Sequence, residues 1–380
     1  MYDLVVKGGL LIDPHQGICE HMDIAISKRK IADVRKGINA AMAKQVINAS
    51  DMIVTPGLID IHTHCCYKIA YLAIDPESMC LAKGSTTIAD AGSTGELLFP
   101  AFREYVINRS KTRIYAFINI ESLGMIEFAK NQKWAKLITD YEDLFIHSDN
   151  TLKMIHENKD IIVGIKWAHH TLKGLKLARE VADKAGCILM AENHYQPETL
   201  KYMKSGDILT HIFHAHPASL KLRPNDGLLD EKGRVQQEFF DAIRRGVLLD
   251  VGHGMGSFSW KVAEQAFRED IKPDTISTDL WVESIKTAYN MPTVMSKFLL
   301  LGMSLEEVIR ASTAKPAEVL GKLGEIGTLK IGSCADITIL KLQKGRFPLL
   351  DTLGEVRCGQ ERLITVGVIR GGDVVYNRLS

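Results

Sequence analysis

Two histidines one residue apart, His62 and His64, follow an apolar run that is interrupted once by Pro56-Gly57. In a β-strand, side chains two positions apart point to the same face, so the two imidazoles project together from the end of a buried strand. Imidazole is a common metal ligand, although a single histidine at a strand end is more often a hydrogen-bonding group. The pair therefore predicts a metal site, provided that the rest of the chain supplies further ligands.

Three more candidate ligands stand where apolar, strand-like runs end: Lys166, His211 and Asp279. A lysine placed against apolar residues is disfavoured in its charged form, and a neutral amine can add carbon dioxide to give a carbamate that bridges two metal ions. Each residue also has an ordinary explanation, as a lysine whose charged end reaches solvent or as a capping side chain. Their recurrence at successive strand ends predicts one shared site.

The segment from residue 54 to 322 alternates strand-like apolar runs with amphipathic helical stretches. Counted with the strand of the histidine pair, the strand candidates number eight, the others being 86–89, 114–118, 161–165, 187–190, 208–210, 247–251 and 275–277. Helical candidates include 172–185, 231–245, 260–268 and 304–313. Strands and helices alternating in this number predict an α/β fold, a (β/α)8 TIM barrel, whose active site lies at the C-terminal ends of the strands.

The two ends of the chain show a different pattern of short β-rich runs separated by turn residues. These runs are 3–6, 10–12, 23–26 and 30–34 near the start, and 327–329, 335–340, 363–369 and 373–376 near the end. Two similar ends that flank a different middle predict one small β-sandwich domain formed from both termini. We expect residues 1–53 plus 323–380 in that domain and 54–322 in the barrel.

Composition limits the kinds of partner. Of 380 residues, 46% are apolar and 24% charged, which is typical of a soluble globular protein with a sizeable core. Lysine plus arginine (47) balance aspartate plus glutamate (46), so we expect a small-molecule substrate and no nucleic acid or membrane partner. The absence of a long apolar run or a signal-like start favours a cytoplasmic location. Seven scattered cysteines predict reduced thiols.

Five motifs, in this order along the chain, resemble the amidohydrolase superfamily. They are P-G-L-I-D-I-H-T-H (56–64), G-S-T-T-I-A-D-A-G (84–92), V-G-I-K (163–166), G-D-I-L-T-H (206–211) and P-D-T-I-S-T-D-L (273–280). Residues 327–337 look like the segment by which these enzymes re-enter their β-sandwich. The runs 250–259 and 295–309 look like a dihydroorotase-related deacetylase group, whose members are sometimes labelled adenine deaminase.

This resemblance implies two divalent metal ions and a role for each candidate ligand. His62 and His64 would bind the more buried ion, a carboxylated Lys166 would bridge to the second, and His211 would bind that second ion. Asp279 would contact the buried ion, accept the proton of a bridging water and pass it to the leaving amine or alkoxide. Two ions about 4 Å apart make hydroxide available near neutral pH. Zinc is the expected metal, and manganese or iron also suits these ligands.

The fifth strand departs from the family's pattern, in which a histidine ends that strand. Counting without gaps puts Glu192 at this position, and His194 lies two residues further on with the same strand parity. Either Glu192 replaces the histidine, or the strand extends so that His194 reaches the metal. A third possibility is a weakened second site and an enzyme with a single ion.

Two further residues are candidates for substrate binding. His253 follows the seventh strand, where we expect it to contact substrate or to support the ligands. Arg223 lies in a loop at 217–230 and is a candidate to hold a substrate carboxylate.

The first functional hypothesis is a metal-dependent hydrolase of an amide or ester bond in a small acylated substrate, of the N-acyl amino acid or O-acyl hydroxy acid type. The alternatives on the same site are a cyclic amide hydrolase of the dihydroorotase or hydantoinase kind and a nucleobase deaminase, because fold alone does not fix the reaction. A third hypothesis is a non-catalytic scaffold, which would hold no metal tightly. From the size of such enzymes we expect a homo-oligomer.

Overall fold

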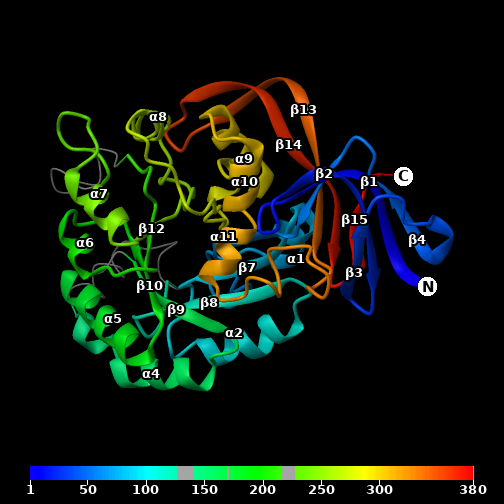
Figure 1. The fold of residues 1–380 in the computed structure, drawn as a ribbon. Helices are drawn as coiled ribbons and strands as arrows, with labels where there is room; N and C mark the ends of the chain where they lie inside the picture. Colours follow the sequence, from blue (N-terminus) through cyan, green and yellow to red (C-terminus); the bar gives the residue numbers. More distant parts are fainter. Residues whose placement is uncertain (126–140, 169–170, 216–226, 380) are drawn as a thin grey trace.

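The computed structural model describes residues 1–125, 141–168, 171–215 and 227–379. Within these residues the strands form two sheets, a seven-stranded parallel sheet from the middle of the chain and an eight-stranded mixed sheet from its two ends (Figure 1). The parallel sheet carries the candidate ligands, and the mixed sheet lies beside it.

The parallel sheet follows the order of the sequence, so each strand pairs with the next along the chain. Its strands are β6 (Leu58–Thr63), β7 (Ser85–Ala91), β8 (Arg113–Asn119), β9 (Ile162–Trp167), β10 (Ile188–Glu192), β11 (Ile208–Thr210) and β12 (Leu248–Leu249). The eighth predicted strand is reduced to two isolated parallel bridges, Asp250 to Thr275 and Thr63 to Leu280. Because these bridges reach Asp250, just after β12, and Thr63, the last residue of β6, residues 275–280 connect the two edges of the curled sheet.

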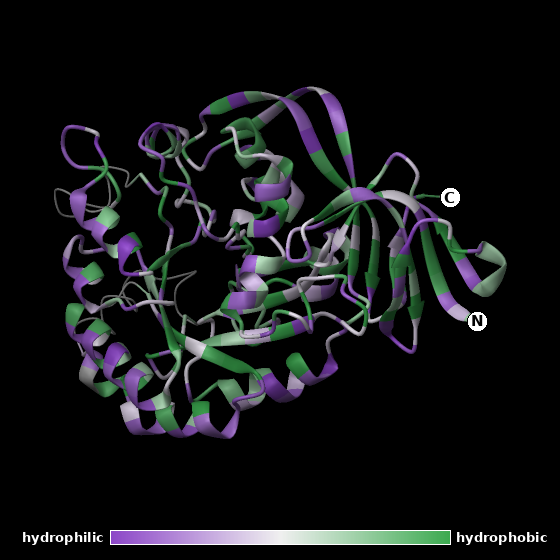
Figure 2. Ribbon diagram, in the orientation of Figure 1, coloured by the Kyte–Doolittle hydropathy of each residue, from purple (hydrophilic) through white to green (hydrophobic). Residues whose placement is uncertain are grey.

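Helices follow most strands of the parallel sheet, as the alternating sequence pattern predicts. They are α1 (Pro76–Met79), α2 (Phe99–Tyr105), α4 (Ser148–Glu157), α5 (Leu172–Ala185), α6 (Glu198–Tyr202), α7 (Gln237–Arg244), α8 (Trp260–Arg268), α9 (Met291–Leu300), α10 (Leu305–Ala311) and α11 (Ala314–Val319). Short 3-10 turns are η1 (Ala40–Met42), η2 (Leu81–Lys83), η3 (Ile107–Arg109), η4 (Glu142–Leu144) and η6 (Ser284–Lys286). Figure 2 shows green, apolar residues along the strands and mixed purple and green residues on the helices around them.

Helix α5 illustrates how local sequence sets these boundaries. The Thr171 side chain accepts hydrogen bonds from two backbone N–H groups of the first turn, and Gly186 ends the helix with a left-handed φ of 65°. Leu175, Ala178 and Ala182 recur at intervals of three and four residues and are buried. In contrast, the predicted helix 231–245 begins only at Gln237, because residues 229–235 form an antiparallel bridge around a turn.

The mixed sheet joins the start and the end of the chain. Its order is β15-β14-β13-β5-β1-β2-β3, with β4 paired to β1. Its strands are β1 (Tyr2–Asp13), β2 (Ile18–Ser27), β3 (Lys30–Arg35), β4 (Ala43–Asn48), β5 (Ile53–Pro56), β13 (Ile337–Leu350), β14 (Val356–Arg370) and β15 (Asp373–Asn377). Since β5 pairs with both β1 and β13, the strand that precedes the histidine pair also connects the two ends.

Two details of the mixed sheet differ from the sequence prediction. Residues 327–329 form no strand, because the Asp13 carboxylate accepts hydrogen bonds from Thr328 Oγ1 and Leu329 N and holds this segment as a loop. Strands β13 and β14 are longer than expected and form a hairpin that extends over α9 toward α8 (Figure 1). Its far end is attached to α8 by an ion pair between Arg357 and Glu264.

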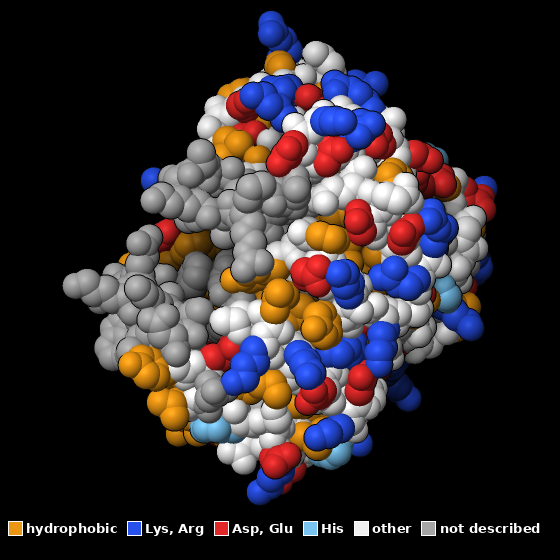
Figure 3. Space-filling view, turned by 90° about the vertical axis from the view of Figure 1, so that its left-hand side faces the viewer, with side chains coloured by type: hydrophobic (Ala, Val, Ile, Leu, Met, Phe, Trp, Pro, Cys, Tyr) orange, Lys and Arg blue, Asp and Glu red, His pale blue; other side chains and the backbone are white. Residues whose placement is uncertain are grey.

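The surface charge is mixed. On the face drawn in Figure 3, lysine and arginine side chains are interspersed with aspartate and glutamate, as expected from the nearly balanced composition. Among the described residues, no helix combines the length and the apolar character that crossing a bilayer requires.

Candidate metal centre

His62, His64 and Asp279 form a buried cluster where β6 meets the closing segment 275–280. One nitrogen or oxygen atom from each lies within 4.8 Å of the others. Asp279 Oδ1 is 3.1 Å from His64 Nε2 and 3.5 Å from His62 Nε2. The two histidines project together from the strand end, as their spacing predicts.

Lys166, Glu192 and His211 extend this cluster across the next strand ends. The fully buried Lys166 Nζ, from β9, lies 3.5 Å from His62 Nε2 and 3.5 Å from Glu192 Oε1. Glu192 Oε1 is also 3.5 Å from His211 Nε2. The structure therefore brings six of the sequence-predicted site residues into one continuous group of nitrogen and oxygen atoms.

His194 lies on the outer side of Glu192. Strand β10 ends at Glu192, and His194 Nε2 is 3.2 Å from Glu192 Oε2, the carboxylate oxygen that does not face Lys166 and His211. The geometry thus puts Glu192 nearer the centre of the group, as the ungapped count indicates. Arg223, the other loop candidate, lies outside the described residues.

A hydrogen-bonded relay orients the His62 ring. His62 Nδ1 lies 2.8 Å from Thr210 Oγ1, and this hydroxyl lies 2.7 Å from Asp250 Oδ2. Because the hydroxyl donates its one proton to the carboxylate, it accepts from Nδ1–H, and the lone pair of His62 is then on Nε2. The ring therefore presents an acceptor atom to the centre.

The rings of His64 and His211 are also oriented by a hydrogen-bond acceptor at Nδ1. His64 Nδ1 is 3.0 Å from Ser93 Oγ, which is in turn 2.7 Å from Asp90 Oδ2. His211 Nδ1 is 2.7 Å from the carbonyl oxygen of Gly252, which can only accept. Supporting groups of this kind fix the tautomer of metal-binding histidines and raise their basicity. In its neutral form, each of the three rings thus carries its lone pair on Nε2, which faces the centre.

Glycines allow the loop after β12 to approach these side chains. A Cβ added at Gly252 would lie 2.3 Å from Thr210 Oγ1, and one at Gly254 would lie 2.2 Å from Asp279 Oδ2. Both glycines have positive φ angles, which disfavour other residues. Gly252 and Gly254 are therefore explained by close packing around the site.

The backbone is strained at two of the candidate ligands. His211 has a φ of 62° and Asp279 a φ of 44°, in the left-handed region that residues other than glycine rarely adopt. Such conformations cost free energy and concentrate at functional sites. Here they aim His211 and Asp279 into the centre from the ends of their strand segments.

The arrangement of charges fits a bound cation. The Nε2 lone pairs face carboxylate oxygens, and Asp279 Oδ1 accepts no hydrogen bond from any described residue although it is buried. Burial and the nearby Lys166 charge lower the pKa of His62 well below its ordinary value, which keeps this ring neutral. A divalent ion would replace the repulsion between these atoms by attraction, and nitrogen and oxygen ligands suit zinc, manganese or iron.

Other ionisable groups respond to burial in different ways. Burial tends to lower the pKa of His211, but its hydrogen bond to Glu192 and the charges of Glu192 and Asp279 raise it overall, so a proton competes with a metal ion for this ring. Burial also raises the pKa of Asp60 to about 7, although Thr278 donates two hydrogen bonds to its carboxylate. Asp60 thereby ties β6 to the closing segment.

His253 is fully buried and anchors its loop. Its ring stacks on Phe258, its Nδ1 lies 3.1 Å from the Gly254 carbonyl oxygen, and its Nε2 lies 2.6 Å from Lys297 Nζ. These contacts support the loop that carries Gly252 and Gly254. A contact of His253 with substrate stays a prediction.

Sequence reasoning missed the residues that support the ligands. These are chiefly Asp60, Asp90, Ser93, Thr210 and Asp250. A signal existed for the three aspartates, because each interrupts or ends an apolar strand-like run, where an unpaired carboxylate would be costly.

A curled parallel sheet with these ligands at its C-terminal edge is typical of metal-dependent hydrolases built on a TIM barrel. The chain belongs to the amidohydrolase family, whose pattern its residues 53–375 match. It is accordingly a hydrolase of carbon–nitrogen bonds.

Individual relatives agree with this assignment. A protein of Enterococcus faecalis named deacetylase is 30% identical over 391 aligned residues, covering 99% of this chain and 100% of that protein. A solved structure of an adenine deaminase is 30% identical, with a TM-score of 0.87, over 99% of this chain and 100% of that one. A solved dihydroorotase is 27% identical, with a TM-score of 0.84, over 98% and 99%. The resemblance to the deacetylase and dihydroorotase-like group and the TIM-barrel-type fold are confirmed.

Proposed function

We propose that the protein hydrolyses an amide or ester bond of a small acylated substrate, of the N-acyl amino acid or O-acyl hydroxy acid type. The observation that carries the proposal is the buried group of His62, His64 and Asp279, joined through Lys166 to Glu192 and His211. The deacetylase name of a relative that aligns over 99% of this chain supports the acyl class of substrate.

Two divalent ions would be held by two sets of residues. We assign His62, His64 and Asp279 to one ion, and His211 with Glu192 to the other, with His194 as the alternative to Glu192. Lys166, as a carbamate formed with carbon dioxide, would lie between the two sets, since its Nζ is equally far from His62 and from Glu192. When bound, the ions would lower the pKa of water to near neutrality and polarise the scissile carbonyl.

Asp279 is the residue of this chain that we assign to proton transfer. Its Oδ1 faces both histidines, and Oδ2 lies beside Gly254, where a side chain would otherwise crowd it. It would accept the proton of the attacking water and return it to the leaving amine or alkoxide. The left-handed backbone of Asp279 and the two bonds from Thr278 to Asp60 hold it in place for this transfer.

Two other reactions on the same site follow from the solved relatives. The adenine deaminase structure favours deamination of a nucleobase, and the dihydroorotase structure favours ring opening of a cyclic amide. The products separate the three reactions: acetate with an amine or alcohol, ammonia, or a ring-opened acid. The scaffold hypothesis would require that the protein bind no metal and release none of these products.

The test is a product screen of the metal-loaded protein. The substrates are N-acetyl amino acids and O-acetyl hydroxy acids of both hands, with adenine and a cyclic imide as comparisons. We expect acetate release that the Asp279→Asn variant lacks while it keeps the wild-type melting temperature. Ammonia from adenine, or ring opening without acetate release, would replace our proposal by the corresponding alternative.

We also propose the division of the chain into a barrel domain of residues 54–322 and a β-sandwich domain of residues 1–53 plus 323–380. The pairing of β5 with β1 and β13 supports the proposal, because it places strands from both ends of the chain in one sheet. Limited proteolysis tests it, because cleavage should concentrate in the turns at 50–51 and 321–325, next to the two boundaries.

A further inference from the structure

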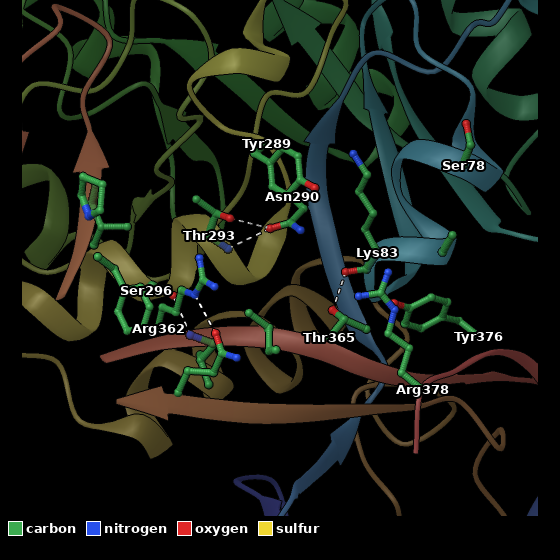
Figure 4. A pocket seen from close by; sticks show the side chains of 17 residues that line it. Ser78, Lys83, Tyr289, Asn290, Thr293, Ser296, Arg362, Thr365, Tyr376 and Arg378 are labelled. Carbon is green, nitrogen blue, oxygen red and sulfur yellow. Dashed lines mark hydrogen bonds between the residues drawn. The ribbon is translucent and has the colours of Figure 1, made fainter. Parts of the chain in front are cut away.

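A second cavity lies away from the candidate metal centre, among the β13–β14 hairpin, β15, α9 and η2 (Figure 4). Its volume is about 710 Å³, and none of the candidate ligands lines it. Pockets for small molecules typically measure roughly 300–1,000 Å³. The cavity is therefore large enough for a separate small ligand.

Three cationic side chains from three different elements line this cavity: Lys83 of η2, Arg362 of β14 and Arg378 after β15 (Figure 4). No aspartate or glutamate is among the lining residues. Within the described part of the chain, none of the three cations forms an ion pair, and Arg362 Nε donates only to the neutral Gln343 Oε1 at 2.8 Å. The cavity thus carries three positive charges without a carboxylate to balance them.

Aromatic rings hold these cations in place of carboxylates. The Lys83 Nζ atom lies 4.5 Å from the centre of the Tyr289 ring. The Arg362 guanidinium lies 4.4 Å from the Phe347 ring, and a similar contact joins Arg378 to Tyr376. The face of an aromatic ring attracts a cation without acting as a conventional hydrogen-bond acceptor. N–H groups of the lysine and the two arginines therefore stay available to an anion.

Helix α9 adds further positive potential at the rim. Its N-cap residue Asn290 and its first-turn residue Thr293 both line the cavity, so the positive end of the helix dipole lies there. Burial lowers the pKa of Lys83, the direction expected for an amine that no carboxylate compensates. The positive end of the helix dipole favours an anion over a neutral ligand.

We propose that this cavity binds a small organic polyanion, whose phosphate or carboxylate groups pair with Lys83, Arg362 and Arg378. Such a ligand would supply the negative charge that the lining lacks and form charge-assisted hydrogen bonds with the two guanidinium groups. This site shares no residue with the metal centre, so the polyanion is tested separately from the reaction proposed there.

Isothermal titration calorimetry with inorganic pyrophosphate and with citrate tests the proposal. The comparison is between wild type, Arg362→Gln with Arg378→Gln, and a control carrying Lys341→Gln with Lys344→Gln. The control removes the same charge from exposed positions of the β13–β14 hairpin that do not line the cavity. We expect the dissociation constant to rise roughly tenfold or more in the first variant and to change by less than about twofold in the control.

Preference for pyrophosphate would identify a phosphate ligand, preference for citrate a carboxylate ligand, and equal binding a general polyanion site. Three results would overturn the proposal: no binding to wild type, equal weakening in both variants, or unchanged affinity in the cavity variant. The last would place the anion elsewhere, for example at the metal centre, which is identical in all three proteins. Should the double variant melt early, Arg378→Gln alone decides, because that side chain is exposed and its guanidinium lies over the Tyr376 ring.

Discussion

The relay from His62 through Thr210 to Asp250 permits a sharp test of how the ligands are oriented. In Thr210→Val the side-chain shape is nearly kept, but the hydroxyl that lies 2.8 Å from His62 Nδ1 and 2.7 Å from Asp250 Oδ2 is lost. The buried Nδ1–H then has no acceptor there. Loss of such a supporting group typically costs about 10–100-fold in metal affinity or activity, which corresponds to about 1.4–2.7 kcal/mol.

Thr275→Val is a matched control for this substitution. Thr275 is equally buried, and its Oγ1 donates to the same carboxylate, to Asp250 Oδ1 at 2.7 Å, but it touches none of the candidate ligands. Both variants should lose stability by about 1–3 kcal/mol, because each removes a buried hydrogen bond to Asp250, and Thr210→Val also removes the contact with His62. Only Thr210→Val should also lose metal affinity.

The assay is a competition titration of the metal-free protein with zinc and a chelator, with thermal melting measured in parallel. If the two variants bind zinc equally well, or lose affinity to the same extent, then the hydroxyl of Thr210 does not orient His62 and the argument from the tautomer is wrong.

Three further predictions concern other parts of the centre. Lys166→Ala should keep one metal ion, lose the second and lose most activity; retention of both ions by elemental analysis would refute its bridging role. Gly254→Ala should reduce activity roughly a hundredfold, since misplaced catalytic groups cost about this much, whereas Gly256→Ala, where an added Cβ meets nothing within 4 Å, should be nearly neutral. Because burial lowers the pKa of Lys297 from 10.5 to about 7, the unfolded chain binds this proton more tightly between those values. The free energy of unfolding should therefore rise with pH in that window. The melting temperature of wild type, measured relative to that of Lys297→Met, should increase from pH 7 to pH 9. A constant difference would show that this amine does not change its protonation on unfolding.

Much of the fold follows from patterns that the sequence displays directly. The helices 172–185 and 260–268 are found at the predicted residues, because a period near 3.6 marks the buried face of both, and Thr171 and Gly186 cap the first. The strand ends that carry His62, Lys166 and His211 were also predicted, since apolar runs that stop at a polar residue locate the edge of a parallel sheet.

The remaining features depend on contacts between distant segments. The closing segment 275–280 makes only bridges, and its position is set by Asp60 through Thr278, a contact across 218 positions of the sequence. Residues 327–329 read as a strand, but the Asp13 carboxylate holds part of them as a loop. Likewise, the spacing of Glu192 and His194 allows either side chain to face the centre. The structure distinguishes them because β10 ends at Glu192. Local periodicity in the sequence does not reveal contacts of this kind.

The central claim is that this group of side chains holds two metal ions. Elemental analysis of metal per protomer, on protein produced with added zinc or manganese and with bicarbonate, tests it most directly. The account predicts about two equivalents, as in bridged two-metal sites. One equivalent would contradict the bridge through Lys166, and a protein that repeatedly yields none would contradict the metal centre itself.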